Sequence, residues 1–275
     1  MRRHAFAALL VVATSFALAF LLLPLLALFL RVTPETLLRQ LGSDVALDAL
    51  VVTFKTSLIA HVFILGVGTP AAYLLGTRRF RGRRLVIALV ELPLVLPPAV
   101  AGIALFAAFG QQGLLGESLG AFGVSLPFTQ AAVVLAVILV ASPFYLRQAI
   151  AAFEAVDPRL LEAARTLGVR PLRAFVRVAL PLAAGGLGAG SALAWARGLG
   201  EFGATIMFAG SLQGVTQTLP LAIYGQLVQD FDTALAIGAF LVVVSGALLL
   251  AVKFLPSWFS SASISPFRSA PSGSS

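Results

Sequence analysis

The sequence contains no cysteine and only two histidines, His4 and His61. Disulfides, thiolate metal ligands, thiol nucleophiles and a lipoprotein anchor are therefore excluded. A metal site is not expected, because such sites need three or four convergent ligands and the two histidines lie far apart. No Gly-x-x-x-x-Gly-Lys-Ser/Thr motif occurs, so the chain has no phosphate-binding loop for ATP. We expect no bound cofactor.

Charged residues are also scarce. They make up 11% of the 275 residues, against roughly a quarter in a soluble domain. Apolar residues make up 59%, and the mean hydropathy is +1.00. A chain of this composition belongs in a lipid bilayer. Its net charge of +8 comes from arginines in short loops between apolar runs, a pattern typical of membrane orientation rather than of nucleic-acid binding.

Six apolar stretches approach or exceed the ~20 residues that a helix needs to cross a bilayer. Their limits are near Ala5–Leu30, Ala46–Gly76, Leu85–Phe109, Phe128–Leu146, Leu182–Phe208 and Thr233–Val252. The first follows Arg2 and Arg3 and contains Ala17-Leu18-Ala19, features that resemble a signal peptide, but its apolar run is too long for one. We therefore expect a retained first helix and an all-α membrane protein with six transmembrane helices over residues 1–255. Residues 256–275 are rich in Ser and Pro and are predicted to be a disordered cytoplasmic tail.

The Lys and Arg residues are distributed unequally between the two sides that six spans define. Fifteen of the 19 precede the first span, follow the second, lie between the fourth and fifth or follow the sixth. Arg31 and Arg39 lie on the opposite side, and the other two lie within spans. Because Lys and Arg accumulate in cytoplasmic loops, we expect a multi-pass plasma-membrane protein with both termini in the cytoplasm.

The longest cytoplasmic segment, 153–181, contains start and stop signals for two helices. Asp157 before Pro158 combines a side-chain cap with a residue whose φ already suits a helix. This helix is expected to end near Gly168, where a left-handed residue would stop it, and Pro171 begins a second, amphipathic helix. A short helix and a tight turn between two spans can act as a lever against another protein.

Glu162, Ala163 and Ala164, followed by Gly168 and a closing Pro181, resemble the EAA loop of bacterial ABC importer permeases. In that family this loop is the coupling helix that docks into a groove of a separate cytoplasmic ATPase subunit. The resemblance implies a type I importer permease that hydrolyses no ATP itself. It also implies a homodimer that works with two ATPase subunits and an extracellular or periplasmic oxyanion-binding protein. The alternative for the loop is an amphipathic connector on the membrane surface.

Two further segments narrow the resemblance. Residues 91–100, ELPLVLPPAV, resemble a signature of molybdate permeases and their sulfate and tungstate relatives, and residues 199–206, LGEFGATI, resemble molybdate permeases in particular. The implied function is translocation of molybdate, with a sulfate or tungstate permease as the alternative within the class. An ion-coupled secondary transporter and an intramembrane enzyme are alternatives from other classes, but no internal repeat and no convergent acid–base cluster is visible.

Three prolines and one ionisable pair are candidates for a pathway or gate. Pro93, Pro97 and Pro98 would interrupt the hydrogen-bond ladder of the third span and kink it, although neighbouring helices can re-satisfy the freed carbonyls. Arg197 and Glu201 lie deepest in an apolar run, where charges are costly. They either attract an oxyanion or form an i, i+4 ion pair that fixes the helix.

Small residues repeat every four positions along the fifth span, namely Gly186, Gly190, Ala194 and Gly198. Small residues at this spacing allow two helices to approach closely. The predicted role is helix packing, within one subunit or across a dimer. The alternative is a smooth wall for a translocation path.

Overall fold

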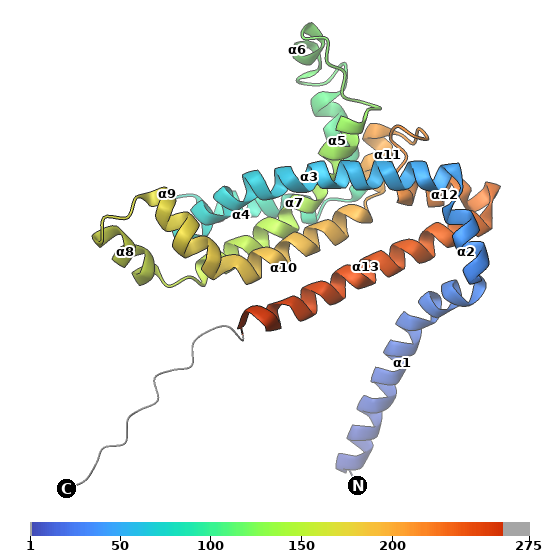
Figure 1. The fold of residues 1–275 in the computed structure, drawn as a ribbon, viewed down its shortest axis with the longest axis horizontal. Helices are drawn as coiled ribbons and strands as arrows, with labels where there is room; N and C mark the ends of the chain where they lie inside the picture. Colours follow the sequence, from blue (N-terminus) through green and yellow to red (C-terminus); the bar gives the residue numbers. More distant parts are fainter. Residues whose placement is uncertain (1, 261–275) are drawn as a thin grey trace.

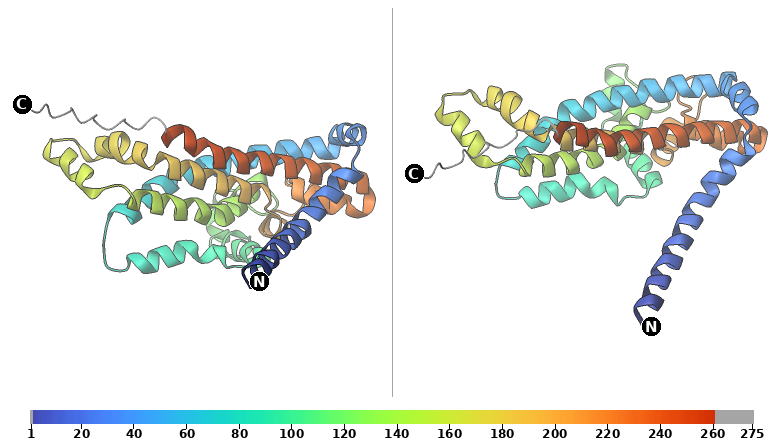
Figure 2. Two further views of the ribbon diagram at one scale, coloured as in Figure 1. Left: turned by 90° about the horizontal axis from the view of Figure 1, so that it is seen from below. Right: turned by 60° about the horizontal axis from the view of Figure 1, so that its bottom comes forward.

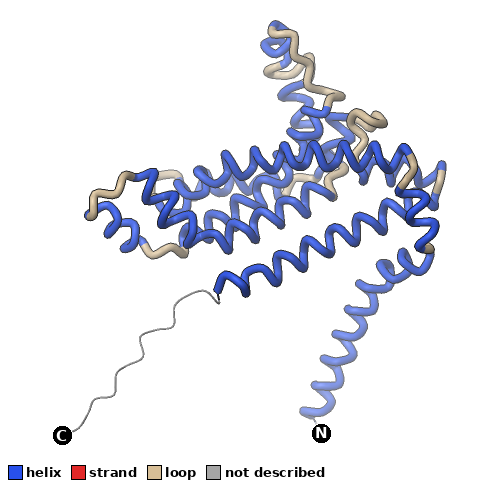
Figure 3. The backbone as a smooth tube through the Cα atoms, in the orientation of Figure 1, coloured by secondary structure: helices blue, strands red, loops and turns tan. Residues whose placement is uncertain are grey.

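The computed structural model describes residues 2–260, and this part of the chain is built from helices joined by turns and loops, without a strand (Figures 1 and 3). The first elements are α1 (Arg2–Arg31), α2 (Pro34–Leu41), α3 (Asp44–Thr77), α4 (Arg83–Glu91), the 3-10 helix η1 (Leu92–Leu94), α5 (Pro98–Phe109) and α6 (Gly116–Ala121). The others are α7 (Gln130–Glu154), α8 (Pro158–Thr166), α9 (Pro171–Ala174), the π-helical turn η2 (Phe175–Ala179), α10 (Leu180–Leu199), α11 (Gly203–Ala209), α12 (Leu219–Gln229) and α13 (Phe231–Ser260).

Within the described residues, five helices are long and apolar enough to cross a membrane: α1, α3, α7, the helix formed by α9, η2 and α10, and α13. The helix formed by α4 and η1 passes the same test together with α5, but the two are bent by 110° at the break between them. Counted as one span, this bent pair gives the six spans that the sequence predicts. The predicted all-α class is confirmed.

Three helix ends differ from the predicted limits. Helix α7 continues past Leu146 to Glu154. No proline lies between Leu146 and Pro158, and Pro158 is the first residue in this stretch that disfavours a helical conformation of the residue before it. The fifth span ends at Leu199 and not at Phe208, because Gly200 and the two residues after it interrupt the helix. Helix α13 runs past the predicted start of the tail at Pro256 to Ser260, and the rest of that predicted tail, 261–275, lies outside the described residues.

Helices α3, α7, α10 and α13 run side by side as a bundle (Figure 1). Helices α8 and α9 lie at one end of it, and α2 and α12 lie at the other. Helix α7 is central, since it packs against α3, α10, α11 and α5. Its buried side chains, Tyr145 and Phe153 among them, join those of α3 and α10 in the largest apolar core.

Polar side chains between these helices are paired. The hydroxyl groups of Thr69 and Tyr145 lie 2.5 Å apart and join α3 to α7. His61 Nε2 lies 2.7 Å from Ser191 Oγ and joins α3 to α10, and its ring packs edge-on against Trp195. Since buried polar groups need a partner, His61 has a structural role, and the described residues hold no cluster of three potential metal ligands.

The stripe of small residues on α10 faces α7. A Cβ atom at Gly190 would lie 2.9 Å from the Cβ of Gln148, and one at Gly198 would lie 3.0 Å from a methyl group of Val137. Ala194, between them, is completely buried. The stripe therefore packs two helices of the same subunit, and the close approach depends on the missing side chains.

Helix α1 stands apart from the bundle and is directed away from it (Figure 2). It contacts α13, and apolar side chains along it, such as Phe16 at 73% and Leu23 at 67%, are largely exposed. An apolar helix with this exposure needs lipid or another protein around it.

The packing of α10 on α7 can be tested at two glycines that lie two residues apart. Replacement of Gly190 by Val should lower the free energy of unfolding by about 1–3 kcal/mol, because the new side chain forces the helices apart. Gly188→Val is the matched control, since a Cβ there meets no atom within 4 Å. Thermal unfolding of the purified protein in detergent is the measurement. Equal melting temperatures for the two variants would contradict the assignment.

Candidate functional site

The segment between α7 and α9 folds as a short helix and a turn. Asp157 Oδ1 accepts a hydrogen bond from the backbone N–H of Arg159 at 2.9 Å and caps α8. After the helix ends, Gly168 adopts φ +73°, the left-handed conformation that glycine allows without strain. Both predicted signals, the helix start and the glycine stop, are confirmed.

Helix α8 presents two distinct faces. Leu161 and Ala164 are buried, and α8 packs on α9 and η2. Glu162 and Ala163 are exposed on the other side. The helix is therefore held by its apolar face and leaves a carboxylate and a small residue accessible to another protein.

Pro181 does not close the segment, contrary to the predicted limit. The chain is helical again from Pro171, and α9, η2 and α10 form one continuous helix with Pro181 inside it. A proline removes one backbone donor, and the π-helical turn at Phe175–Ala179 directly precedes α10. Such turns absorb local changes in helix geometry.

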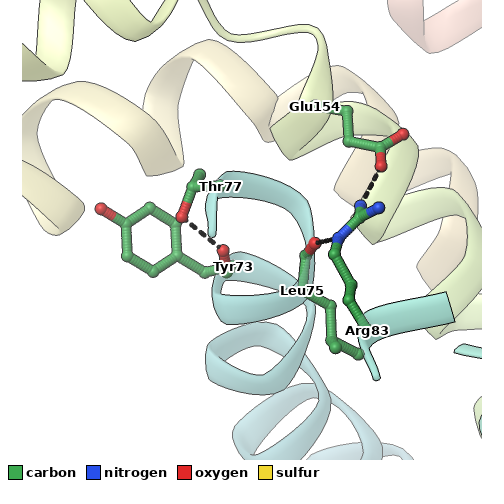
Figure 4. A network of polar contacts seen from close by, with 5 residues as sticks. All are labelled: Tyr73, Leu75, Thr77, Arg83 and Glu154. Carbon is green, nitrogen blue, oxygen red and sulfur yellow. Dashed lines mark hydrogen bonds and ion pairs between the residues drawn. The ribbon is translucent and has the colours of Figure 1, made fainter. Parts of the chain in front are cut away.

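A network of polar and aromatic contacts lies beside α8, at the ends of α3 and α7 (Figure 4). Arg83, in the first turn of α4, donates through Nε to the carbonyl oxygen of Leu75 at 2.5 Å and forms an ion pair with Glu154. Tyr73 packs against Phe153, with ring centroids 5.3 Å apart, and against Phe175 of η2, at 4.7 Å. Four elements that border α8 are thus tied together.

The bent span breaks at its prolines, as predicted. Pro93 lies in η1, Pro97 precedes α5 and Pro98 begins it. The carbonyl of Pro97 accepts a hydrogen bond from Ala101 at 3.1 Å, so the new helix starts directly after the break. Pro93 and Pro98 line a cavity of about 140 Å³ together with Arg197, whereas Pro97 does not reach it.

Arg197 and Glu201 form an ion pair, with 2.8 Å between Nη2 and Oε2. The Glu201 side chain is 1% exposed, and its Oε1 accepts a hydrogen bond at 2.7 Å from the N–H of Ala204, in the first turn of α11. A buried carboxylate needs such partners. Glu201 therefore fixes both the arginine and the start of α11, and Arg197 also faces the cavity.

The two sequence motifs meet in space at this point. A Cβ atom at Gly203 would lie 2.6 Å from the Cβ of Pro98, and one at Gly102 would lie 2.7 Å from the carbonyl oxygen of Ala204. The glycines therefore allow α11 and α5 to touch. The motif at residues 91–100 and the motif at residues 199–206 are therefore in contact. Their spacing along the chain does not indicate this contact.

Sequence reasoning missed a second charged pair. Glu91 is the last residue of α4, just before the proline break, and its Oε1 is 3.7 Å from Nε of Arg147 on α7. In the sequence, the position of Glu91 at the start of the proline motif is the one feature that suggests a role for this carboxylate. The partner depends on how the bent span lies across α7.

Comparison with known proteins shows which family this chain resembles. Residues 68–259 match the family model described as binding-protein-dependent transport system inner membrane component. The molybdenum transport system permease protein ModB of Mycobacterium bovis is 43% identical over 235 residues, covering 86% of this chain and 89% of that protein. The sulfate transport system permease protein CysT of Salmonella typhimurium is 34% identical over 248 residues, covering 89% and 90%.

A solved structure has the same architecture. It is that of a bacterial alginate ABC transporter in complex with an alginate pentasaccharide-bound periplasmic protein. The TM-score is 0.75 at 17% sequence identity, with 96% of this chain and 97% of that chain covered. At this identity the likeness establishes the fold, which is that of an ABC importer permease.

The network beside α8 can be tested at Arg83. Arg83→Ala should speed amide hydrogen exchange at residues 75–83 and 154–157 about fivefold, the effect of losing ~1 kcal/mol of local stability. The pair is partly exposed and therefore screened, so the expected loss is small. Arg81→Ala, on an exposed neighbour, is the control. Equal exchange in the two variants would show that Arg83 does not hold these helix ends.

Proposed function

This chain belongs to the family of binding-protein-dependent transport system inner membrane components, and on that basis we propose that it is the membrane-spanning subunit of an ATP-driven molybdate importer. The observation that carries the proposal is the extent of similarity to a molybdenum permease, which includes both motifs at the proline break. ATP hydrolysis belongs to a separate subunit in this proposal, because the chain has no phosphate-binding loop.

Helix α8 is the proposed contact with the ATPase subunit. Its exposed Glu162 and Ala163 supply the docking face, Ala164 and Leu161 hold the helix to the bundle, and Gly168 sets the angle of the turn. This role requires the α8 end of the bundle to lie in the cytoplasm. The concentration of arginines at that end supports the orientation, with both termini on the same side.

The cavity at the proline break is proposed to be part of the translocation pathway. Pro93, Pro97 and Pro98 create the bend, Arg197 supplies hydrogen-bond donors to the cavity, and Glu201 neutralises and positions the arginine. Breaks of this kind inside a membrane occur where the backbone lines a cavity or is buried in protein.

The proposed assembly is a homodimer with two ATPase subunits and an external oxyanion-binding protein. Helices α5 and α6 project from the side of the bundle (Figure 1), and Leu114 in the loop between them and Phe122 directly after α6 are exposed. Together with α1, they offer apolar surface for a second copy of the chain.

Coupling to the ATPase can be tested at Gly168. Gly168→Leu should lower molybdate uptake and co-purification of the ATPase subunit about tenfold, because the left-handed conformation costs a branched residue ~1–2 kcal/mol and the turn reorganises. Gly168→Asn is the matched control, since asparagine adopts this conformation readily. Glu162→Lys should give a similar loss through the docking face alone. Normal uptake and recruitment in Gly168→Leu and Glu162→Lys would make α8 an ordinary connector.

Deletion of the gene tests the substrate. Cells without this chain should lose high-affinity uptake of labelled molybdate and keep normal growth on sulfate. Complementation with the intact gene is the control. Loss of sulfate uptake with molybdate uptake unaffected would favour a sulfate permease, the second candidate, which the similarity to a sulfate permease also supports.

A further inference from the structure

A second cavity adjoins the one at the proline break. It has a volume of about 560 Å³ and is lined by Leu94, Phe144, Arg147, Gln148 and Leu193. Leu94 and Phe144 also line the first cavity, which contains Arg197. The two cavities therefore share two lining side chains, and together they are called the groove between the bent span, α7 and α10.

The groove has an arginine in each half. On α10, Gly198 packs beside Ala141, so the neighbouring Arg197 lies level with that part of α7. Arg147 is the sixth residue after Ala141 along α7, which corresponds to about 9 Å of helix rise. Arg147 itself precedes the end of α7 at Glu154 by seven residues, or ~10 Å. Arg197 and Arg147 thus lie at successive levels along the bundle axis towards the α8 end.

The exposure of Arg147 indicates what this groove faces. Its side chain is 71% exposed in the single chain, and the neighbouring Gln148 is exposed as well. Arg147 lies in the last two turns of α7, at the cytoplasmic end of the predicted fourth span, where basic side chains reach water or the membrane interface. This end of the groove is therefore accessible to a polar solute.

Each arginine is neutralised by one carboxylate. Arg197 pairs with Glu201 at 2.8 Å, and Arg147 lies 3.7 Å from Glu91. A guanidinium has five N–H donors in a planar fork, so one carboxylate leaves donors free. Neutralisation also keeps the attraction for an anion moderate, and a conducting path needs sites that bind a solute and still release it.

We propose that the groove is a two-station path for tetrahedral oxyanions, in which Arg197 and then Arg147, with the amide of Gln148, donate hydrogen bonds to the passing dianion. The chemistry fits molybdate, tungstate and sulfate alike, because the donors recognise charge and oxygen geometry. The inference rests on the proposed importer function and extends it to Arg147, Gln148 and Glu91.

The test uses Arg147 and not Arg197. Removal of Arg197 would leave Glu201 buried without its partner, and such a variant can fail to fold. Arg147→Gln, Arg147→Lys and Glu91→Gln avoid this problem because the pair is more exposed. Arg78→Gln is the control, since that arginine is exposed outside the groove.

The complete complex, with its ATPase subunits, is reconstituted in liposomes with saturating loaded binding protein. Labelled molybdate taken up and ATP hydrolysed are measured together. Arg147→Gln should lower the molybdate taken up per ATP about tenfold, the effect of one charge-assisted donor group. Arg147→Lys keeps the charge but not the planar fork of donors, so its loss should be smaller than that of Arg147→Gln, about threefold. Glu91→Gln keeps the arginine with all its donors, so its effect should also be smaller than that of Arg147→Gln.

Two results would contradict the proposal that the groove is the oxyanion path. Equal losses in Arg147→Gln and Glu91→Gln would show that the pair acts only as a structural tie between the bent span and α7. An unchanged ratio in Arg147→Gln would show that the anion does not contact the arginine. Absence of molybdate uptake and of stimulated ATP hydrolysis in the unaltered complex is a separate result, which would overturn the proposed importer function itself.

Discussion

Hydrocarbon offers no hydrogen-bond partner, so a chain inside a bilayer must satisfy its own backbone N–H and C=O groups. Most of this chain does so with uninterrupted helices. Two breaks, after η1 and after α10, are exceptions, and they lie against each other through Pro98 and Gly203. Prolines remove donors at the first break, and the Glu201 carboxylate accepts the N–H of Ala204 at the second. The second break is covered by protein, with Glu201 buried, whereas the first is partly exposed in the single chain and borders a cavity through Pro98.

This arrangement explains why charged side chains lie within an apolar span. A carboxylate that caps α11 from a buried position requires a cation nearby, and Arg197 supplies it. The arginine in turn borders the cavity that the proline bend opens. The same relation recurs one step along α7, where Arg147 lies near Glu91 at the head of the bend. Each ion pair thus lies beside a helix break and borders a cavity.

The α8 end of the bundle connects to this region through rigid elements. Leu161 of α8 and Phe153 of α7 border the same cavity, and Arg83 ties the end of α7 to the start of α4. Helix α4 continues through η1 to the proline bend. Helix α8 thus packs on α9 and on the π-helical turn η2, and its Leu161 shares an apolar core with Phe153 of α7.

The sequence by itself determined the helical class, the six apolar spans and the helix and turn of α8, because hydropathy, capping and glycine conformation act over a few neighbouring residues. It also identified residues 91–100 and 199–206 as motifs. It placed the end of the fifth span wrongly, since apolar residues continue past the break at Gly200. Only the tertiary structure decided that the two motifs touch and that Arg147 meets Glu91. Those contacts join residues far apart in the chain, and they depend on the angle of the bent span against α7 rather than on any local pattern.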